Sequence, residues 1–231
     1  MNGNNDNKNV LITGASRGLG RALAESFYVK RYNLVLNDAE SFTFNHNQAS
    51  GKNIDVVIGN IMEPATIEKL SAIIYEKHKR IDIIINNAGI IYIQPFEQNT
   101  EEELRNVFGT NLIAPILLTQ RFYPLMQKQK SGHIVNILST AARYGKPNHT
   151  MYCASKFGLA GFTQSLRQEA KQYNIKVSAI YPGGMKTDLY KGLSTKIDTS
   201  RFMHPEDVAR TILALIEAKD VLGEEIVINN M

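Results

Sequence analysis

Residues 10–20 read Val10-Leu11-Ile12-Thr13-Gly14-Ala15-Ser16-Arg17-Gly18-Leu19-Gly20. The apolar beginning is typical of a buried strand, and Ala22, Leu23 and Phe27 continue at helical spacing behind the glycines. Glycines let a turn approach a phosphate closely, and the N-terminus of the following helix supplies N–H donors. The segment therefore predicts a pyrophosphate-binding turn, although an ordinary strand-to-helix turn would share the pattern. Its predicted cofactor contacts are Gly14, Ser16, Arg17, Gly18, Leu19 and Gly20.

Short apolar runs alternate with helical patterns along the chain. The expected strands are Val10–Ile12, Leu34–Leu36, Asp55–Ile58, Ile81–Ile85, Ile134–Leu138, Val177–Tyr181 and Ile226–Ile228. The expected helices are Arg21–Lys30, Ala65–Lys77, Glu101–Lys128, Tyr152–Gln172 and Pro205–Ala218. This alternation predicts an α/β Rossmann fold: a doubly wound, mostly parallel seven-stranded sheet with helices on both faces. We expect a single domain at 9–231 after a polar, disordered N-terminus at 1–8, with a kink in the long helix at Pro115 or Pro124.

Tyr152 and Lys156 form a second pattern, on an expected helix. Because they are four residues apart, their side chains share one helix face. A cation near a phenol favours the phenolate and lowers the pKa of the phenol from about 10 towards neutrality. Ser139 follows the apolar run of an expected strand, so its hydroxyl is expected at the carboxyl end, where it could hydrogen-bond a substrate oxygen. The three residues predict interconversion of an alcohol and a carbonyl with Tyr152 as general acid/base, whereas the alternative is an amphipathic helix with a solvated lysine.

Four motifs in this order resemble the short-chain dehydrogenase/reductase family, from about Lys8 to the end of the chain. The matching residues are Thr13-Gly14-x-x-x-Gly18-x-Gly20; Asn86-Asn87-Ala88-Gly89; the catalytic four Asn111, Ser139, Tyr152 and Lys156; and Pro182-Gly183 with Thr187. The resemblance implies hydride transfer between NAD(H) or NADP(H) and a carbonyl or secondary alcohol. It also implies that Lys156 holds the nicotinamide ribose, that Asn111 anchors a water, and that Pro182, Gly183 and Thr187 lie beside the nicotinamide. Asn87, Ala88 and Gly89 are expected close to a ribose.

The choice of dinucleotide depends on two opposed signals. Asp38 closes the second expected strand, where a carboxylate can accept hydrogen bonds from the adenosine ribose. That carboxylate would repel the extra phosphate of NADP by about 4 kcal/mol per charge at about 4 Å and an effective dielectric of about 20. Arg17 points the other way, because the resemblance associates a basic residue there with NADP. We expect NAD(H) to be favoured over NADP(H), with Asn60 and Ile61 beside the adenine, where Asn60 stands in place of the family's aspartate.

Composition excludes several other classes of function. The net charge of +4 in 231 residues comes without a basic run, so we expect no nucleic-acid partner. The five histidines lack ligand spacing, so we expect no metal. Cys153 is the one cysteine, which excludes an internal disulfide and suits a reducing compartment. Without a signal peptide or a membrane-spanning stretch, the protein is expected to be cytoplasmic and free of membranes.

The substrate is expected to be a small carbonyl or alcohol compound. The expected pocket residues are Ile90, Ile91, Tyr92, Ile93, Arg143, Tyr144, Met185 and Tyr190, under a lid formed by Asp188–Ile197. The resemblance implies a homodimer or homotetramer through the helices at Glu101–Lys128 and Tyr152–Gln172, although packing on their own sheet explains the same apolar residues. A non-catalytic dinucleotide-binding sensor or regulator is the alternative function. A sugar-nucleotide epimerase or dehydratase would need a larger carboxyl-terminal region.

Overall fold

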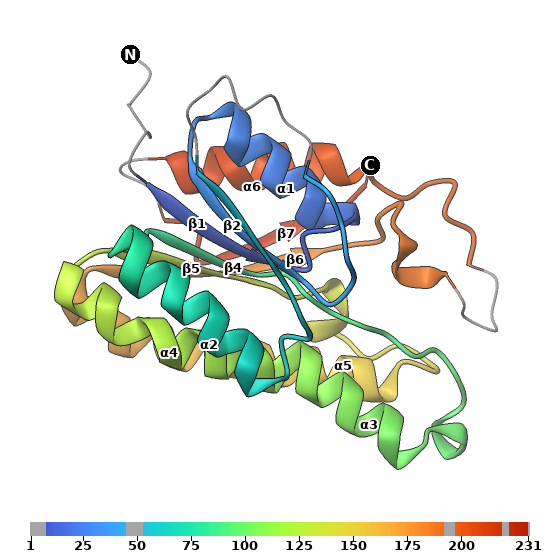
Figure 1. Cartoon of the computed structure of the whole chain (residues 1–231). Coiled ribbons are helices and arrows are strands. Elements are labelled where there is room, and N and C mark those ends of the chain that lie inside the picture. The colour runs from blue at the N-terminus through green and yellow to red at the C-terminus, as the bar shows by residue number, and fades with distance from the viewer. Residues whose placement is uncertain (1–7, 45–52, 192–196, 219–221, 231) are drawn as a thin grey trace.

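The computed structural model describes residues 8–44, 53–191, 197–218 and 222–230. Within these residues seven strands form one sheet in the order β3-β2-β1-β4-β5-β6-β7, and each neighbouring pair is parallel (Figure 1). The strands are β1 (Asn9–Thr13), β2 (Asn33–Asp38), β3 (Ile54–Ile58), β4 (Ile83–Asn86), β5 (Gly132–Ile137), β6 (Ile175–Pro182) and β7 (Glu225–Ile228). The predicted doubly wound α/β fold is confirmed, and the sheet expected to be mostly parallel is parallel throughout its described part.

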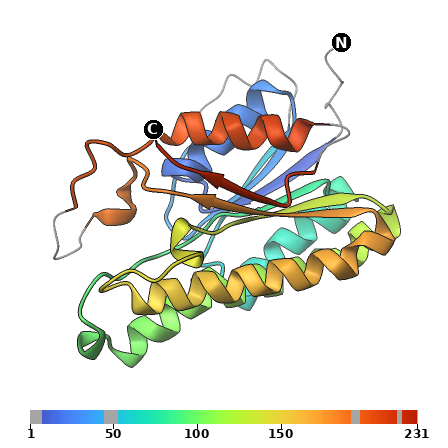
Figure 2. The same cartoon turned by 180° about the vertical axis from the view of Figure 1, so that it is seen from behind.

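Helices cover both faces of the sheet (Figures 1 and 2). One layer contains α1 (Gly18–Val29) and α6 (Pro205–Glu217). The other contains α2 (Pro64–Ala72), α3 (Glu101–Phe108), α4 (Ala114–Gln129) and α5 (Thr150–Ala170). Two π-helical turns, η2 (Ile73–His78) and η4 (Gly109–Ile113), continue α2 and join α3 to α4. The short 3₁₀ turns are η3 (Phe96–Gln98), η5 (Thr140–Ala142), η6 (Lys171–Tyr173) and η7 (Asp188–Tyr190).

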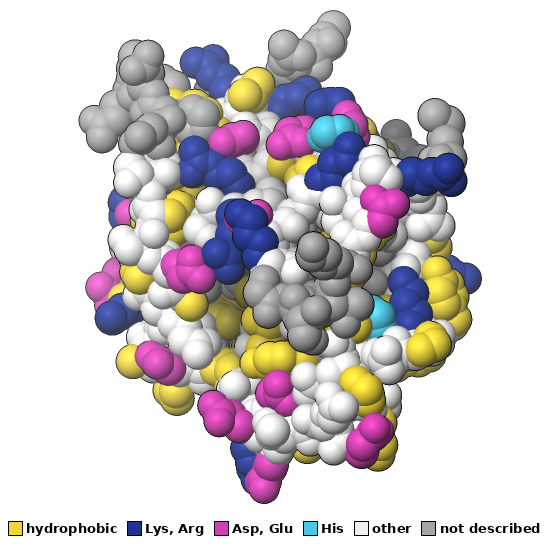
Figure 3. All heavy atoms as spheres, turned by 90° about the vertical axis from the view of Figure 1, so that its right-hand side faces the viewer, with side chains coloured by type: hydrophobic (Ala, Val, Ile, Leu, Met, Phe, Trp, Pro, Cys, Tyr) yellow, Lys and Arg dark blue, Asp and Glu magenta, His cyan; other side chains and the backbone are white. Residues whose placement is uncertain are grey.

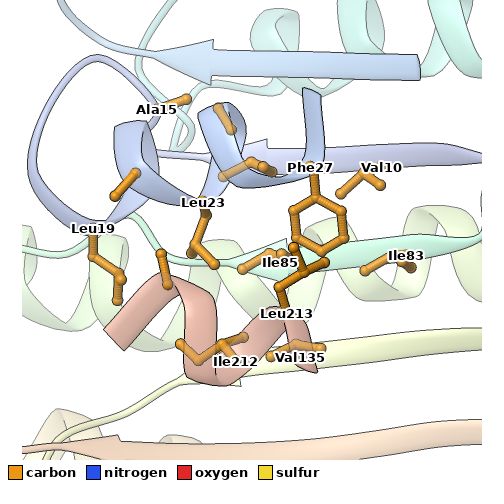
Figure 4. Packing of buried hydrophobic residues seen from close by; sticks show 14 of the residues in the cluster. Val10, Ala15, Leu19, Leu23, Phe27, Ile83, Ile85, Val135, Ile212 and Leu213 are labelled. Atoms are coloured by element: carbon orange, nitrogen blue, oxygen red, sulfur yellow. The ribbon is translucent and has the colours of Figure 1, made fainter. Parts of the chain in front are cut away.

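Apolar packing on both faces explains why the central strands are continuously apolar. Successive side chains of a strand point to opposite faces, so Val10 packs under α1 and α6 while Leu11 packs under the other layer. Figure 4 shows the hydrophobic cluster between the sheet and helices α1 and α6, in which Phe27 of α1 and Leu213 of α6 contact the strands. The Phe27 ring also contacts Tyr32 edge to face at 4.9 Å between centroids. The sheet is therefore fixed from both sides.

The strand order places a crevice at one end of the sheet. β1 lies between β2 and β4, and the chain leaves it first towards β2 and later reaches β4 on its other side. The connecting helices α1 and α2 consequently lie on opposite faces (Figure 1). In open parallel sheets such a reversal separates the loops at the carboxyl ends of the strands, and ligands bind between them. The predicted motifs follow β1, β2, β4, β5 and β6, so the fold brings them to this end.

The long helix expected at Glu101–Lys128 is interrupted, but not at a proline. The break is η4, where the backbone widens into a π turn. Pro115 lies two residues after η4, in the first turn of α4, and Pro124 lies inside α4 without ending it.

Parts of two expected segments lie outside the described residues: 1–7 of the polar N-terminus and 192–196 of the lid. Lys8 is described and exposed, and its carbonyl accepts a hydrogen bond from the N–H of Asn33 at 2.9 Å. In the part of the chain that the structure describes, no helix has both the length and the apolar character to cross a membrane. The cytoplasmic location stays a prediction.

Candidate active site

Glycines give the turn after β1 its shape. Gly14 and Gly18 have φ angles of +65° and +55°, a left-handed region that residues with a Cβ rarely adopt. A Cβ at Gly20 would overlap the carbonyl oxygen of Gly14, so α1 could not begin this close to the turn with another residue there. The N-cap of α1, Arg17, makes no side-chain cap hydrogen bond. The first N–H groups of α1 thus keep their capacity for an anion.

Thr13 and Asn87 fasten this turn to the end of β4. The Thr13 hydroxyl accepts hydrogen bonds from the N–H groups of Asn87 at 3.1 Å and Ala88 at 3.0 Å. The Asn87 amide donates to the carbonyls of Thr13 at 2.9 Å and Gly14 at 3.0 Å. Two motifs that are far apart in the sequence therefore hold each other in place.

The turn also fits a dinucleotide pyrophosphate. The buried Oγ of Ser16 has no hydrogen-bond partner among the described residues, a costly arrangement unless a ligand supplies one. The methyl group of Thr187 lies 3.1 Å from the point where a Cβ of Gly18 would stand, so only a bare backbone fits between them. An orphaned hydroxyl, a bare glycine backbone and a helix N-terminus together suit a phosphate group.

Asp38 ends β2 beside the turn, with its carboxylate held by backbone donors. Its Oδ2 accepts from the N–H of Ser16 at 3.0 Å, and its Oδ1 accepts from the N–H of Glu40 at 3.1 Å. A carboxylate oxygen can accept more than one hydrogen bond, so both oxygens can still receive a ribose hydroxyl. The acid is thus oriented before any ligand binds.

Arg17 lines the same end of the cleft, but it is paired. Its Nη1 lies 2.9 Å from Oε2 of Glu40, with the two side chains 55% and 63% exposed. The residue that favoured NADP in the sequence therefore has an acidic partner that the sequence analysis missed. Around this end stand two carboxylates, Asp38 and Glu40, and the Arg17 guanidinium.

The end of the cleft where the adenine is expected is formed by the segment after β3. The Oδ1 of Asn60 already accepts from the N–H of Met62 at 3.0 Å, which leaves it capacity for a second donor. Ile61 is buried and lines the cleft with Met62. The Met62 sulfur accepts a hydrogen bond from the Thr110 hydroxyl at 3.3 Å, so this end of the cleft contacts η4.

Helix α5 brings Tyr152 and Lys156 to the other end of the cleft. The two residues are 7% and 3% exposed. The Nζ of Lys156 lies 5.9 Å from the centroid of the Tyr152 ring and donates to the carbonyl of Ile137 at 2.8 Å. Ser139 follows β5, and its hydroxyl lies close enough to the Tyr152 phenol to lower the pKa of that phenol. Side chains from a strand end and a helix therefore lie together around the Tyr152 ring.

Burial is the largest influence on the pKa values of Tyr152 and Lys156. Burial raises the pKa of Tyr152 above the ordinary value, and the nearby Ser139 hydroxyl offsets only part of that rise. Burial also lowers the pKa of Lys156 from 10.5 to about 8. The expected lowering of the Tyr152 pKa by Lys156 is absent from this structure, because the ammonium is directed at the Ile137 carbonyl while desolvation disfavours the phenolate. At pH 7 the phenol holds its proton.

Asn111 lies fully buried in η4 and joins the loop after β4 to α5. Its Oδ1 accepts from the N–H of Ile90 at 2.9 Å, and its Nδ2 donates to the Ile90 carbonyl at 2.9 Å and to Oγ of Ser155 at 3.1 Å. Ser155 in turn donates to the Tyr152 carbonyl at 2.8 Å. The side chain of Asn111 thus contacts backbone and a serine, and its role as a water anchor stays a prediction.

The segment after β6 closes one side of the cleft. Pro182 ends β6, and the N–H of Gly183 donates to the carbonyl of Ile228 at 2.8 Å. Thr187 lies against Gly18, and its hydroxyl accepts from the N–H of Leu189 at the start of η7. Pro182 and Gly183 therefore fix where the segment begins, and Thr187 contacts the glycine turn.

One cleft of about 440 Å³ gathers most of the predicted site residues, a size typical of cofactor sites. The predicted residues that line it are Gly14, Arg17, Gly18, Leu19, Asp38, Asn60, Ile61, Asn87, Ala88, Gly89, Tyr152, Lys156 and Thr187. The predicted residues outside its lining are Ser16, Gly20, Asn111, Ser139, Pro182 and Gly183.

Several lining residues were missed by the sequence analysis. They are Asn37, Ala39, Glu40, Met62, Asn106, Thr110, Ile137 and Leu138. Asn106 and Thr110 are four apart at the end of α3 and the start of η4, so helical spacing could have paired them once one was known to face the cleft. Glu40 lies two residues beyond Asp38. A second acidic residue so close to Asp38 was the one sign in the sequence that it could face the cleft.

The face that carries the strand ends has mixed charge. Figure 3 shows this side of the molecule, with lysine and arginine side chains interspersed among aspartate and glutamate. Among the residues that the structure describes, no three His, Cys, Asp or Glu side chains are grouped to hold a metal ion.

Comparison with known proteins identifies the family. The family model for short chain dehydrogenase matches residues 8–198. The chain belongs to the short-chain dehydrogenase/reductase family. It is 32% identical to a sepiapterin reductase of Chlorobaculum tepidum over 95% of this chain and 94% of that protein. It is 34% identical to a 3-oxoacyl-[acyl-carrier-protein] reductase of Synechocystis over 88% of this chain and 86% of that protein.

Solved structures agree with this assignment. A 4-hydroxyisoleucine dehydrogenase mutant complexed with NADH and succinate superposes with a TM-score of 0.85 at 28% identity, covering 96% of this chain and 97% of that one. A metagenomic short-chain oxidoreductase in complex with NADP gives 0.82 at 25% identity, with 98% of both chains covered. The protein is thus an NAD(P)-dependent oxidoreductase, and these similar proteins include binders of either dinucleotide.

Proposed function

We propose that this protein is a carbonyl reductase in which Tyr152 exchanges a proton with the substrate oxygen. The observation that carries the proposal is the position of Tyr152 and Lys156 at one end of a cleft whose other end is the glycine turn, with the Ser139 hydroxyl near the phenol. A bound nicotinamide dinucleotide supplies or accepts the hydride. The residues of the chain must then place a carbonyl carbon at that ring and handle the proton.

Each side chain has a part that follows from its chemistry. Ser139 donates a hydrogen bond to the substrate oxygen and stabilises the negative charge that develops there during reduction. Tyr152 gives that oxygen its proton. Lys156, charged near neutral pH, exchanges its hydrogen bond with the Ile137 carbonyl for the hydroxyls of the nicotinamide ribose. Nearer the phenol, the ammonium favours the phenolate that proton transfer leaves behind.

The protonation of Tyr152 favours reduction as the working direction near neutral pH. Burial raises its pKa, so the phenol is protonated and ready to donate. Oxidation of an alcohol would need a phenolate at the start, which burial disfavours. We therefore expect reduction to be faster than oxidation at pH 7 and oxidation to gain as pH rises.

NAD(H) is the proposed cofactor. Asp38 is fixed by two backbone N–H groups and lines the cleft at the ribose end. A carboxylate there accepts hydrogen bonds from ribose hydroxyls and repels a 2′-phosphate. The proposal fails if kcat/KM is much higher with NADPH than with NADH.

The substrate is proposed to be a ketone flanked by apolar groups. Tyr152 packs in a cluster with Ile91 and Ile93 from the loop after β4, and Leu189 and Tyr190 from η7 lie against it. Sepiapterin and 3-oxoacyl groups, named for two relatives, both carry a carbonyl. Apolar walls beside one polar oxygen site suit such compounds better than sugars or small acids.

A panel of ketones and aldehydes with NADH and NADPH tests this function. We expect loss of NADH absorbance with medium-sized apolar ketones, and much slower turnover with charged or sugar substrates. No consumption of either cofactor across the panel, despite binding of the dinucleotide, would contradict the proposed reaction.

Self-association is proposed through the outer surface of η4, α4 and α5. Ile113, Leu117 and Phe157 are 50%, 42% and 46% exposed there, a cost that burial against another copy would remove. Each side chain buried in this way contributes on the order of 1 kcal/mol or more. A homodimer or homotetramer is accordingly proposed.

A further inference from the structure

Glu40 and Arg17 form an ion pair at the ribose end of the cleft, in a place where both could meet the adenosine half of a dinucleotide. The Arg17 Nη1 lies 2.9 Å from Oε2 of Glu40, and both residues line the cleft with Asp38. Glu40 is fastened to the same point, because its N–H donates to Oδ1 of Asp38 at 3.1 Å. The pair therefore stands beside the carboxylate proposed to receive the ribose.

Charge counting shows what this pair does to a 2′-phosphate. Asp38 and Glu40 contribute two negative charges, and Arg17 contributes the positive charge of the pair. A phosphate brings between one and a half and two further negative charges. For Arg17 to bind that phosphate, its guanidinium must leave Glu40, whose carboxylate then stands unpaired next to another anion. The ion pair is exposed, so its contribution to folding stability is small; its effect on a phosphate is that Arg17 must give up this contact before it can bind the anion.

We propose that Glu40 is a specificity-determining residue that holds Arg17 away from the 2′-phosphate and so excludes NADP(H). This inference rests on the proposed NAD preference and adds a second cause to it. Asp38 rejects the phosphate by direct repulsion, whereas Glu40 removes the cation that would otherwise offset the repulsion. The glycine turn of this chain thus carries an arginine without gaining the use of NADP(H).

A matched set of variants tests the proposal. Glu40→Gln removes the charge with little change in shape, at a side chain that is 63% exposed, so folding is expected to be unaffected. Glu25→Gln is the control, because Glu25 pairs with Arg21 at 2.7 Å on α1 and lies outside the lining of the cleft. Arg17→Gln and the double variant with Glu40→Gln complete the cycle.

The measurements are the dissociation constants of ADP-ribose and 2′-phospho-ADP-ribose, together with kcat/KM for NADH and NADPH. We expect Glu40→Gln to tighten binding of the phosphorylated ligand by about tenfold and to change ADP-ribose by less than about twofold. The double variant is expected to lose this gain, and Glu25→Gln to show none. The same ordering is expected in kcat/KM.

Two results would overturn the inference. One is that Glu40→Gln leaves the ratio of the two dissociation constants unchanged. The same result follows if Glu25→Gln changes the ratio equally, because the effect would then come from the net charge of the protein. The other is a gain that persists in the double variant, since Arg17 would then have no part in it. Failure of ADP-ribose to bind the wild-type protein is a different outcome, which would contradict the proposed dinucleotide site itself.

Discussion

Lys156 is a buried cation, and its burial opposes folding. The side chain is 3% exposed, and burial lowers its pKa to about 8, against 10.5 for an ordinary lysine. Between these two pH values the unfolded chain binds the proton and the folded chain releases it, so stability rises with pH across that window. Below pH 8 the full penalty is present. A residue kept at this cost is best explained by the chemistry it serves in the cleft.

Replacing Lys156 with Met should therefore stabilise the protein while removing activity. Lowering the pKa of Lys156 from 10.5 to about 8 costs about 3 kcal/mol of folding free energy. The variant recovers this energy but loses the hydrogen bond to the Ile137 carbonyl, which offsets about 1 kcal/mol of the gain. We expect Lys156→Met to raise the free energy of unfolding by about 2 kcal/mol at pH 7, with a smaller gain at pH 10. Urea denaturation at both pH values measures this. Lys69→Met, at an exposed position, is the control, and destabilisation of Lys156→Met at pH 7 would contradict the account.

At the scale of elements, a buried histidine joins β5, β6 and the approach to β7. The Ser178 hydroxyl donates to the carbonyl of Gly223 at 2.6 Å, so the 2.8 Å contact between Ser178 Oγ and His133 Nε2 requires the proton on Nε2. Burial lowers the pKa of His133 to about 4, and the charge of Lys176 adds to this. The ring is therefore neutral over the ordinary pH range.

Lowering the pH should decrease the stability of the folded protein through protonation of His133. The unfolded chain takes up a proton near pH 6.5 and the folded chain only near 4, so stability falls as pH decreases between these values, by up to about 3 kcal/mol. Stability curves from pH 7 to pH 4 should be flatter for His133→Gln than for the wild type. Equal slopes for the wild type and His133→Gln would contradict the assignment.

The elements differ in how far the sequence could predict them. The central strands were found because burial on both faces makes them continuously apolar, as in Val10–Ile12 and Ile134–Leu138. The π turn η4 was not, because a proline pattern gives no exact place for a break and the contacts made by this turn are tertiary. Asn111 bonds to the backbone of Ile90, and the Met62 side chain packs directly on Gly109. A sequence shows prolines in that region but not these contacts.

At the scale of the whole molecule, parallel strands gather motifs that are distant in the sequence. The glycine turn, Asp38 and the Tyr152–Lys156 pair could be placed from the sequence, since each follows a recognisable strand or sits on one helix face. The partner of Arg17 and the direction of the Lys156 ammonium could not, because both depend on side chains brought together by folding.

Association of copies should depend on the surface of α4. A substitution of Leu117 by Glu places a charge among side chains proposed to be buried between copies, so it should yield a monomer of 25.9 kDa. Size-exclusion chromatography with light scattering measures the mass. Val29→Glu, at a 74% exposed site on α1 across the sheet, should leave the mass of the assembly unchanged. A monomeric wild type would refute the proposed surface.

The most direct test is the turnover of Tyr152→Phe with the best ketone from the panel. The phenylalanine ring keeps the packing against Ile91 and Ile93 and removes only the hydroxyl. We predict a fall in kcat of roughly 10²–10⁴-fold, the usual contribution of a general acid, with NADH affinity nearly unchanged. Tyr75→Phe, at an exposed tyrosine of η2 that lies outside the lining of the cleft, should retain full activity. Wild-type turnover in Tyr152→Phe would contradict the central claim that this phenol carries the proton.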